Sequence, residues 1–267
     1  MSGNMHGEDA SVRRVRLEVE ELAFTRPSGD LFGPMSFSID AGQIVGVIGP
    51  TGSGKSALFD LVAGRHMPRS GSIMLDGRGI DMLDADARSR LGLVLVSDPA
   101  PMLSGVTVFD WLALAIQLVD RSPLQMLLRG RRSLDASQAG DIAAILQFCS
   151  LQNLAKERLS TLTPAQLKMT EIARGLCQRP RLMLLHRPFS GLPRGQRHDL
   201  ALVLRDIAAE AVTLMIVDEQ LDVLAPLCDR MLVLQRGHLV AAGAVDELAG
   251  NEAAVQAFTG SSSRAAA

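Results

Sequence analysis

Eight consecutive residues have the types and spacing of a phosphate-binding loop. They read G-x-x-x-x-G-K-S: Gly49, Pro50, Thr51, Gly52, Ser53, Gly54, Lys55 and Ser56. In such a loop successive backbone N–H groups point at anionic oxygens, and the start of the next helix adds partial positive charge. We expect Lys55 to reach the β- and γ-phosphates and the Ser56 hydroxyl to be a magnesium ligand. The sequence therefore predicts that the chain binds a nucleoside triphosphate.

The segments on either side of this loop are those that the motif requires. The apolar run 44–48 before it is typical of a strand, and residues 56–63 after it have the composition of a helix. A strand, a glycine-rich turn and a helix together make a phosphate cradle. Because all three are present, we interpret the loop as a nucleotide site and not as a structural turn.

Beyond the loop, expected strands and helices alternate along the chain. Wholly apolar runs such as 91–96 and 181–185 predict strands buried on both faces. The alternation predicts an α/β fold with a mostly parallel sheet, and short strands around the loop add a small antiparallel layer. The other expected strands are 15–24, 35–39, 71–77 and 212–217, with a hairpin at 231–242, and the expected helices are 106–119, 138–149, 165–178, 195–209, 221–227 and two short ones at the C-terminus.

Composition limits the function classes. The chain has 267 residues, of which 47% are hydrophobic and 21% charged, as in an ordinary soluble globular protein. Its formal net charge of -2 argues against nucleic acid as a partner. No apolar run approaches the roughly 20 residues of a membrane-spanning helix, and the N-terminus lacks a hydrophobic signal segment. Three widely separated cysteines, in or beside apolar runs, are expected to be reduced core residues: Cys149, Cys177 and Cys228.

From about Leu17 to Gly260 the chain resembles the ATP-binding cassette (ABC) proteins, the nucleotide-binding subunits of ABC transporters. The segments that carry the resemblance are 17–22, 41–50, 106–110, 171–176 and 227–234. The resemblance implies a P-loop NTPase (RecA-like) core with a small antiparallel β layer and a helical subdomain. It also implies bound ATP and Mg²⁺.

The same resemblance implies a domain plan. We expect one ATP-binding domain over 14–260, with a helical lobe at about 97–165. The ends, 1–13 and 261–267, are expected to be disordered because they are small and polar.

Within the family, the chain looks most similar to the ATPases of branched-chain amino-acid importers. The insertion at about 120–135 and the ending 251–260 suggest this type. The implied partners are integral membrane permease subunits and a second ATP-binding subunit, identical or different. The implied location is cytoplasmic, peripheral on the inner face of the cell membrane. The arginines in the insertion are interpreted as a solvated loop, with contact to lipid headgroups or a membrane-bound partner as the alternative.

The position of the catalytic acids departs from the family pattern. In the family the strand corresponding to 181–185 ends in Asp-Glu, which holds magnesium and polarises water, whereas this chain has His186 and Arg187. The following Pro188 and 190–192 fit the family frame, which fixes the register. Imidazole is a poor ligand for Mg²⁺, and arginine cannot act as a base at neutral pH. We expect a weakened metal site and no residue that activates water.

A second departure concerns the histidine that contacts the γ-phosphate in the family. After Ile216-Val217 this position holds Glu219. A carboxylate there would repel a γ-phosphate. Arg187 and Glu219 should be neighbours in this fold, and we hypothesise that they form an ion pair within about 4 Å.

The signature motif of the family, Leu-Ser-Gly-Gly-Gln in most members, is also altered. It aligns with Leu162, Thr163, Pro164, Ala165 and Gln166. Thr163 keeps a hydroxyl that could meet a phosphate across a dimer interface. Pro164 removes a backbone donor and Ala165 adds a methyl group. The alternative register on Leu159-Ser160 would shift 172–174 by three residues.

Two loops of the family pattern lack their usual residues. The segment 96–99 stands where a glutamine is expected, so Ser97 or Asp98 could offer an oxygen to a metal ion instead. In a further loop, Pro193 replaces an aspartate.

The adenine-stacking aromatic of the family aligns with Arg26. An arginine can itself stack on a base. Phe24 and Phe32 are close in sequence and are the alternative stacking residues.

These features favour a degenerate ABC subunit, which binds ATP and hydrolyses it slowly or not at all. Catalytic positions His186, Arg187 and Glu219 are the altered ones, and the cradle is intact. A regulatory or scaffolding protein that uses ATP as a switch is the alternative from another class. A normally active transporter ATPase with unusual substitutions is the third hypothesis.

Overall fold

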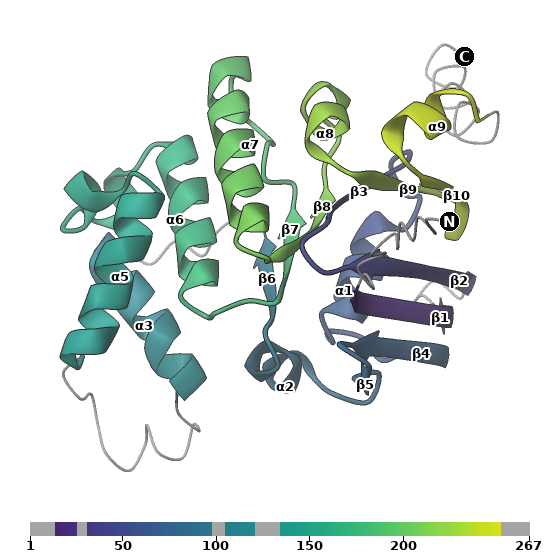
Figure 1. Cartoon of the computed structure of the whole chain (residues 1–267), viewed down its shortest axis with the longest axis horizontal. Helices are drawn as coiled ribbons and strands as arrows, with labels where there is room; N and C mark the ends of the chain where they lie inside the picture. Colours follow the sequence, from purple (N-terminus) through teal and green to yellow (C-terminus); the bar gives the residue numbers. More distant parts are fainter. Residues whose placement is uncertain (1–13, 26–30, 98–104, 121–133, 252–267) are drawn as a thin grey trace, which may run out of the picture.

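A computed structural model describes residues 14–25, 31–97, 105–120 and 134–251. Two sheets dominate it, with helices between and outside them (Figure 1). Several predictions fall outside the described residues: the terminal segments 1–13 and 261–267, and the basic insertion around 121–132.

The smaller sheet is antiparallel, as predicted from the short strands around the phosphate loop. Its strand order is β2-β1-β4-β5. Residues that alternate along β1, such as Leu17 and Val19, are buried, whereas Glu20 is exposed. One face therefore joins the core. The bounds are β1 (Val15–Thr25), β2 (Leu31–Asp40), β4 (Ser70–Leu75) and β5 (Arg78–Gly79).

The larger sheet is mostly parallel, as predicted. Its order is β10-β9-β3-β8-β7-β6, and only the edge strand β10 runs antiparallel to its neighbour. The strands are β3 (Ile44–Ile48), β6 (Leu93–Ser97), β7 (Leu182–His186), β8 (Thr213–Val217), β9 (Arg230–Gln235) and β10 (His238–Gly243). The other five strands lie parallel, and the glycine-rich loop 49–56 follows the end of β3.

Helices cover the larger sheet on one face, while α1 lies between the two sheets (Figure 1). The central strands are apolar on both sides because alternate residues enter different cores. In β7, Leu184 packs into the core that contains α1, and Leu185 packs into the core that contains α7 and α8. The helices are α1 (Lys55–Val62), α2 (Ala85–Arg90), α3 (Val108–Asp120), α5 (Ala136–Phe148), α6 (Pro164–Leu176), α7 (Arg194–Ala209), α8 (Leu221–Leu227) and α9 (Val245–Ala249).

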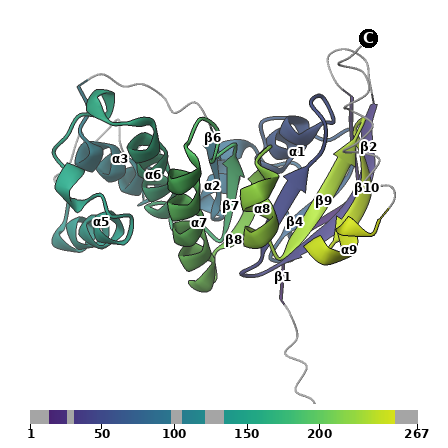
Figure 2. The same ribbon diagram turned by 90° about the horizontal axis from the view of Figure 1, so that it is seen from above.

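Helices α3, α5 and α6 gather at one end of the molecule (Figure 2). They share an apolar cluster of their own, which includes Leu112, Ile142 and Ala173. The lobe predicted at about 97–165 therefore has its own core, although its limits as a unit stay a prediction.

Helix α2 is an element that the sequence reading did not anticipate. Its residue Arg88 is fully buried and donates to four backbone oxygens, including Leu61 O at 2.7 Å and Val62 O at 2.8 Å. Those two carbonyls lie at the C-terminal end of α1, where carbonyls lack partners within the helix. Arg88 thus fixes the far end of the helix whose start carries the phosphate loop.

The cysteines agree with their predicted role. All three are free and buried. Burial raises the pKa of each thiol to about 12, so the thiols stay protonated at neutral pH.

In the part of the chain that the structure describes, no helix is both long and apolar enough to cross a bilayer.

Candidate functional site

The glycine-rich loop connects the end of β3 to the start of α1. Gly49 has φ +147° and passes so close to β9 that a Cβ atom would lie 2.1 Å from the Leu234 carbonyl oxygen. Only glycine fits there. The helix start at Gly54 has no side-chain cap and no acidic residue in its first turn. Its backbone N–H groups and dipole therefore remain available to an anion.

Two buried side chains of the loop are poised for a ligand. The Ser53 hydroxyl oxygen is buried and, among the described residues, has no hydrogen-bond partner. Lys55 is 8% exposed, and its Nζ donates to the carbonyl oxygens of Gly49 at 2.6 Å and Pro50 at 2.9 Å. Burial lowers the pKa of Lys55, while the nearby Glu219 charge raises it and Arg187 lowers it. Phosphate oxygens would replace the carbonyls as acceptors for this ammonium group.

His186 meets the loop at the position expected for the metal-binding acid. The Ser56 hydroxyl oxygen and His186 Nε2 lie 3.1 Å apart. Strand β7 ends at His186, and α1 begins at Lys55, next to Ser56. The parallel sheet therefore brings His186 and Ser56 together. The His186 ring also packs edge-on against Phe59 of α1, with centroids 6.0 Å apart. The contact between Ser56 and His186 is the one that the register inferred from Pro188 leads us to expect.

A pocket of about 350 Å³ joins the loop to the altered positions. Arg187 and Glu219 both line this pocket with exposed side chains. Both residues are among those that the structure describes, and their charged atoms do not come within 4.0 Å of each other. The predicted ion pair is therefore not formed. Exposed charges gain little from pairing, because water already solvates each of them. The lining residues are Thr51, Gly52, Gly54, Lys55, Ser56, Ala57, His186, Arg187, Val217, Asp218 and Glu219.

Asp218 is a pocket residue that the sequence reading missed. It is 3% exposed, and one carboxylate oxygen accepts the Phe189 N–H at 2.8 Å. The other oxygen accepts the N–H groups of Glu219 at 2.7 Å and Gln220 at 3.2 Å. Three backbone donors thus occupy the carboxylate and tie together the loops after β7 and β8. The position of Asp218, one residue before Glu219, could have indicated that it lies in the pocket. Its three backbone partners could not be predicted from the sequence.

The altered signature residues lie outside this pocket, at the start of α6. Thr163 is exposed and caps the helix, since its hydroxyl accepts the Gln166 N–H at 3.4 Å. The Gln166 side chain accepts the Thr163 N–H at 2.9 Å, and Pro164 occupies the first turn, where its missing N–H costs nothing. In the rival register the hydroxyl belongs to Ser160, which is also exposed but lies in a short 3-10 helix before α6 and does not cap it. The alignment on 162–166 therefore places its hydroxyl at the exposed helix start.

Other predicted positions are not brought to the pocket. Ser97 pairs with His186 across β6 and β7 and does not line the pocket, and Asp98 lies outside the described residues. Arg26, the predicted base-stacking residue, is also outside them. Phe32 is 0% exposed and cannot stack on a base, which corrects that alternative. The Phe24 ring already stacks on His66 with centroids 5.3 Å apart.

The site fits a nucleotide phosphate chain better than it fits Mg²⁺. The loop, the unpartnered Ser53 hydroxyl and Lys55 suit phosphate. A magnesium ion prefers several oxygen ligands, but beside the Ser56 hydroxyl the pocket offers an imidazole, the Asp218 carboxylate that three N–H groups occupy, and the exposed Glu219 carboxylate. Across the described residues, no group of three metal-binding side chains occurs.

Comparisons with known proteins identify the family of the chain. A family model described as ABC transporter matches residues 32–190. The lipopolysaccharide export system ATP-binding protein LptB of Escherichia coli (strain K12) is 26% identical over 227 residues, which cover 85% of this chain and 89% of that protein. The "Probable branched-chain amino acid transport ATP-binding protein LivG" of Methanocaldococcus jannaschii is 26% identical over 214 residues, covering 80% of this chain and 83% of that protein.

A solved structure shares the fold. The crystal structure of an ATP-binding cassette of an ABC transporter in its ADP conformation superposes with a TM-score of 0.82, at 23% sequence identity. The match covers 92% of this chain and 99% of that chain. At this identity the likeness shows the fold alone.

Proposed function

The chain belongs to the ABC transporter family as an ATP-binding subunit, and on that premise we propose that it binds ATP in the 49–56 loop and hydrolyses it slowly or not at all. The contact between Ser56 and His186 carries the proposal. It puts an imidazole where the family supplies a carboxylate for magnesium. The neighbouring Arg187 cannot accept a proton from water.

The expected loss of turnover is large. Phosphoryl transfer depends on positioning and on charge stabilisation, much of it from magnesium. Removing one such contribution commonly costs about 10²-fold or more in rate. Here the acid pair is replaced and Glu219 adds negative charge beside the γ-phosphate position. These roles act as a unit, so the losses do not simply add.

The test is ATP binding and turnover with and without Mg²⁺, in the natural chain and in Lys55→Ala. We expect ATP binding that Lys55→Ala abolishes, with little Mg²⁺-dependent phosphate release in either protein. Mg²⁺-dependent turnover that Lys55→Ala removes would establish an active ATPase and overturn the proposal of impaired hydrolysis.

We further propose that the chain pairs with a second ATP-binding subunit and docks on membrane permease subunits at the inner face of the cell membrane. Membership of the family supports this assembly. The regulatory alternative predicts no such assembly. Affinity purification from membranes distinguishes the two hypotheses. A permease that stays bound through detergent washing supports the transporter subunit, and the absence of a permease supports the regulatory protein.

For the transported solute we propose branched-chain amino acids. The arginine-containing insertion and the ending 251–260 support this type, as does the similarity to LivG. Lipopolysaccharide export is the competing assignment, because LptB of Escherichia coli is equally similar at 26% identity. Loss of labelled leucine uptake on deletion of the gene would favour the first, and an envelope defect with normal uptake would favour the second.

A further inference from the structure

A second hollow lies far from the nucleotide pocket. It has a volume of about 520 Å³, and half of its ten lining residues are arginines. Gly92 and Arg181 in its wall precede β6 and β7, whereas His186 ends β7. A five-residue strand spans about 16 Å, so the hollow lies at the opposite edge of the sheet from the nucleotide pocket. Its lining residues, called the arginine pocket, are Arg14, Leu75, Asp76, Arg78, Arg90, Leu91, Gly92, Gln178, Arg179 and Arg181.

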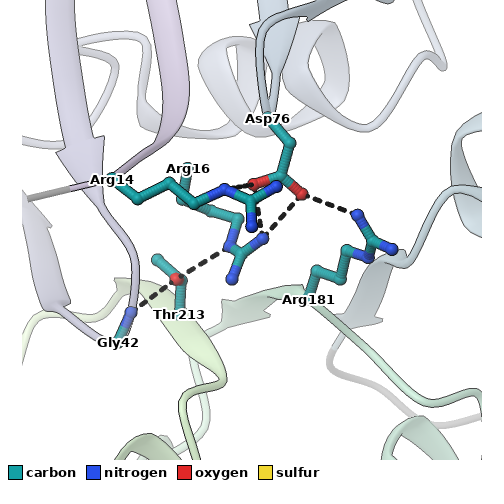
Figure 3. A network of polar contacts seen from close by, with 6 residues as sticks. All are labelled: Arg14, Arg16, Gly42, Asp76, Arg181 and Thr213. Carbon is teal, nitrogen blue, oxygen red and sulfur yellow. Dashed lines mark hydrogen bonds and ion pairs between the residues drawn. The ribbon is translucent and has the colours of Figure 1, made fainter.

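Asp76 organises the floor of the arginine pocket (Figure 3). The Arg16 guanidinium donates to both oxygens of Asp76, at 2.5 and 2.6 Å, and Arg181 donates at 3.0 Å. Arg14 adds an ion pair at 3.7 Å, and the Arg16 Nε atom also donates to Thr213. The side chains of Asp76 and Arg16 are only 8% and 10% exposed. A single carboxylate therefore holds three arginines in place.

Asp76 remains charged beside these arginines. Burial acts to raise its pKa, but the hydrogen bonds from Arg181 and Arg16 and the neighbouring positive charges hold the pKa below its ordinary value. Its oxygens are already committed to Arg16 and Arg181. Asp76 thus positions the arginines without balancing all of their charge.

Positive charge exceeds negative charge in the arginine pocket. Asp76 is the single acid among the lining residues, against five arginines. Arg90 and Arg179 pair with acids outside the lining, Asp86 and Asp141. Arg78 forms no side-chain ion pair or hydrogen bond with any residue in the described ranges. Since the whole chain has a net charge of -2, this excess is local.

We propose that the arginine pocket binds a compact phosphate-bearing anion with several negative charges. Planar guanidinium groups donate pairs of parallel hydrogen bonds to phosphate, and an anion would relieve the repulsion between the gathered arginines. Among the described residues, the pocket is lined by guanidinium groups and by no aromatic ring, and guanidinium groups are the donors that match phosphate geometry. The site is independent of the 49–56 loop.

The test measures inorganic tripolyphosphate binding by calorimetry in the Lys55→Ala chain, so that the nucleotide loop does not contribute. We expect one binding site that weakens as salt is raised. Arg78→Gln should weaken binding about tenfold, because it removes one charged donor. Arg158→Gln, the same change at an exposed arginine of the helical end, is the matched control and should bind like the parent.

Arg78→Gln should also leave the thermal unfolding temperature unchanged, since Arg78 holds no described partner. Two sources of phosphate are distinguished with vesicles. Sedimentation with phosphatidic acid vesicles that Arg78→Gln prevents assigns a lipid headgroup, and tripolyphosphate binding without sedimentation assigns a soluble anion. No binding to either probe, or binding that Arg78→Gln and Arg158→Gln affect equally, overturns the proposal.

Discussion

Replacing His186 by aspartate should make ATP binding depend on Mg²⁺. The Ser56 hydroxyl oxygen and His186 Nε2 lie 3.1 Å apart. Adjacent ligands of an octahedral magnesium ion, with bonds of about 2.0–2.1 Å, are about 2.9 Å apart. The side chain at position 186 therefore faces the Ser56 hydroxyl but carries the wrong ligand type. His186→Asp supplies a hard oxygen without changing the backbone.

The size of the effect follows from the charges. A carboxylate about 4 Å from a doubly charged ion gains about 8 kcal/mol at an effective dielectric constant of 20. Desolvation of both ions offsets most of this gain. Even groups that only orient a metal ligand change metal affinity by about 10–100-fold. We therefore expect His186→Asp to bind ATP at least about tenfold more tightly with Mg²⁺ than with EDTA, whereas the natural chain shows a ratio near one.

Calorimetric titration of ATP, with Mg²⁺ or with EDTA, measures the ratio directly. His198→Asp is the matched control, because it makes the same change at an exposed histidine of α7 outside the nucleotide pocket. Ser56→Ala in the His186→Asp chain should abolish the new dependence by removing the second ligand.

Two results would refute this reasoning. One is a natural chain that already binds ATP more than about tenfold better with Mg²⁺, since position 186 would then tolerate imidazole. The other is an equal ratio in His186→Asp and His198→Asp. Either would mean that the residue at position 186 does not control the metal.

Three further predictions concern charge and protonation. Glu219→Gln should tighten ATP binding about three- to tenfold by removing a negative charge from the pocket, which the same titration measures. Asp76→Asn should lower the free energy of unfolding by about 3 kcal/mol, because Arg16 loses its buried counter-charge, and urea denaturation with Arg158→Gln as control checks this. The free energy of unfolding should also fall as pH rises from 9.0 toward about 12, because the unfolded chain releases the thiol protons of Cys149, Cys177 and Cys228 while the folded chain retains them. An unfolding free energy that stays constant over this pH range would contradict this prediction.

Local chemistry allowed much of the nucleotide site to be predicted. The loop 49–56 is contiguous with its strand and helix, so one stretch of sequence contains the whole cradle. The apolar runs predicted the central strands, because a strand covered on both faces has no polar side. Pro188 set the predicted register of His186, and the structure places His186 beside Ser56.

Other features depended on partners that are distant along the chain. Helix α2 is short and polar, and its Arg88 reads as a surface residue until the carbonyls at the end of α1 are seen around it. The predicted ion pair between Arg187 and Glu219 was wrong, because the position of two residues on neighbouring strands does not fix where their exposed side chains point.

The sequence by itself predicted a phosphate cradle at 49–56 and determined that positions 186 and 187 hold histidine and arginine, because those properties reside in residue types at fixed spacing. The tertiary structure alone decided that Asp218 is occupied by backbone donors and that Asp76 gathers arginines from separate segments. The residues of the arginine pocket span positions 14–181, and sequence patterns carry no information on such distances. Only folding brings those charges together.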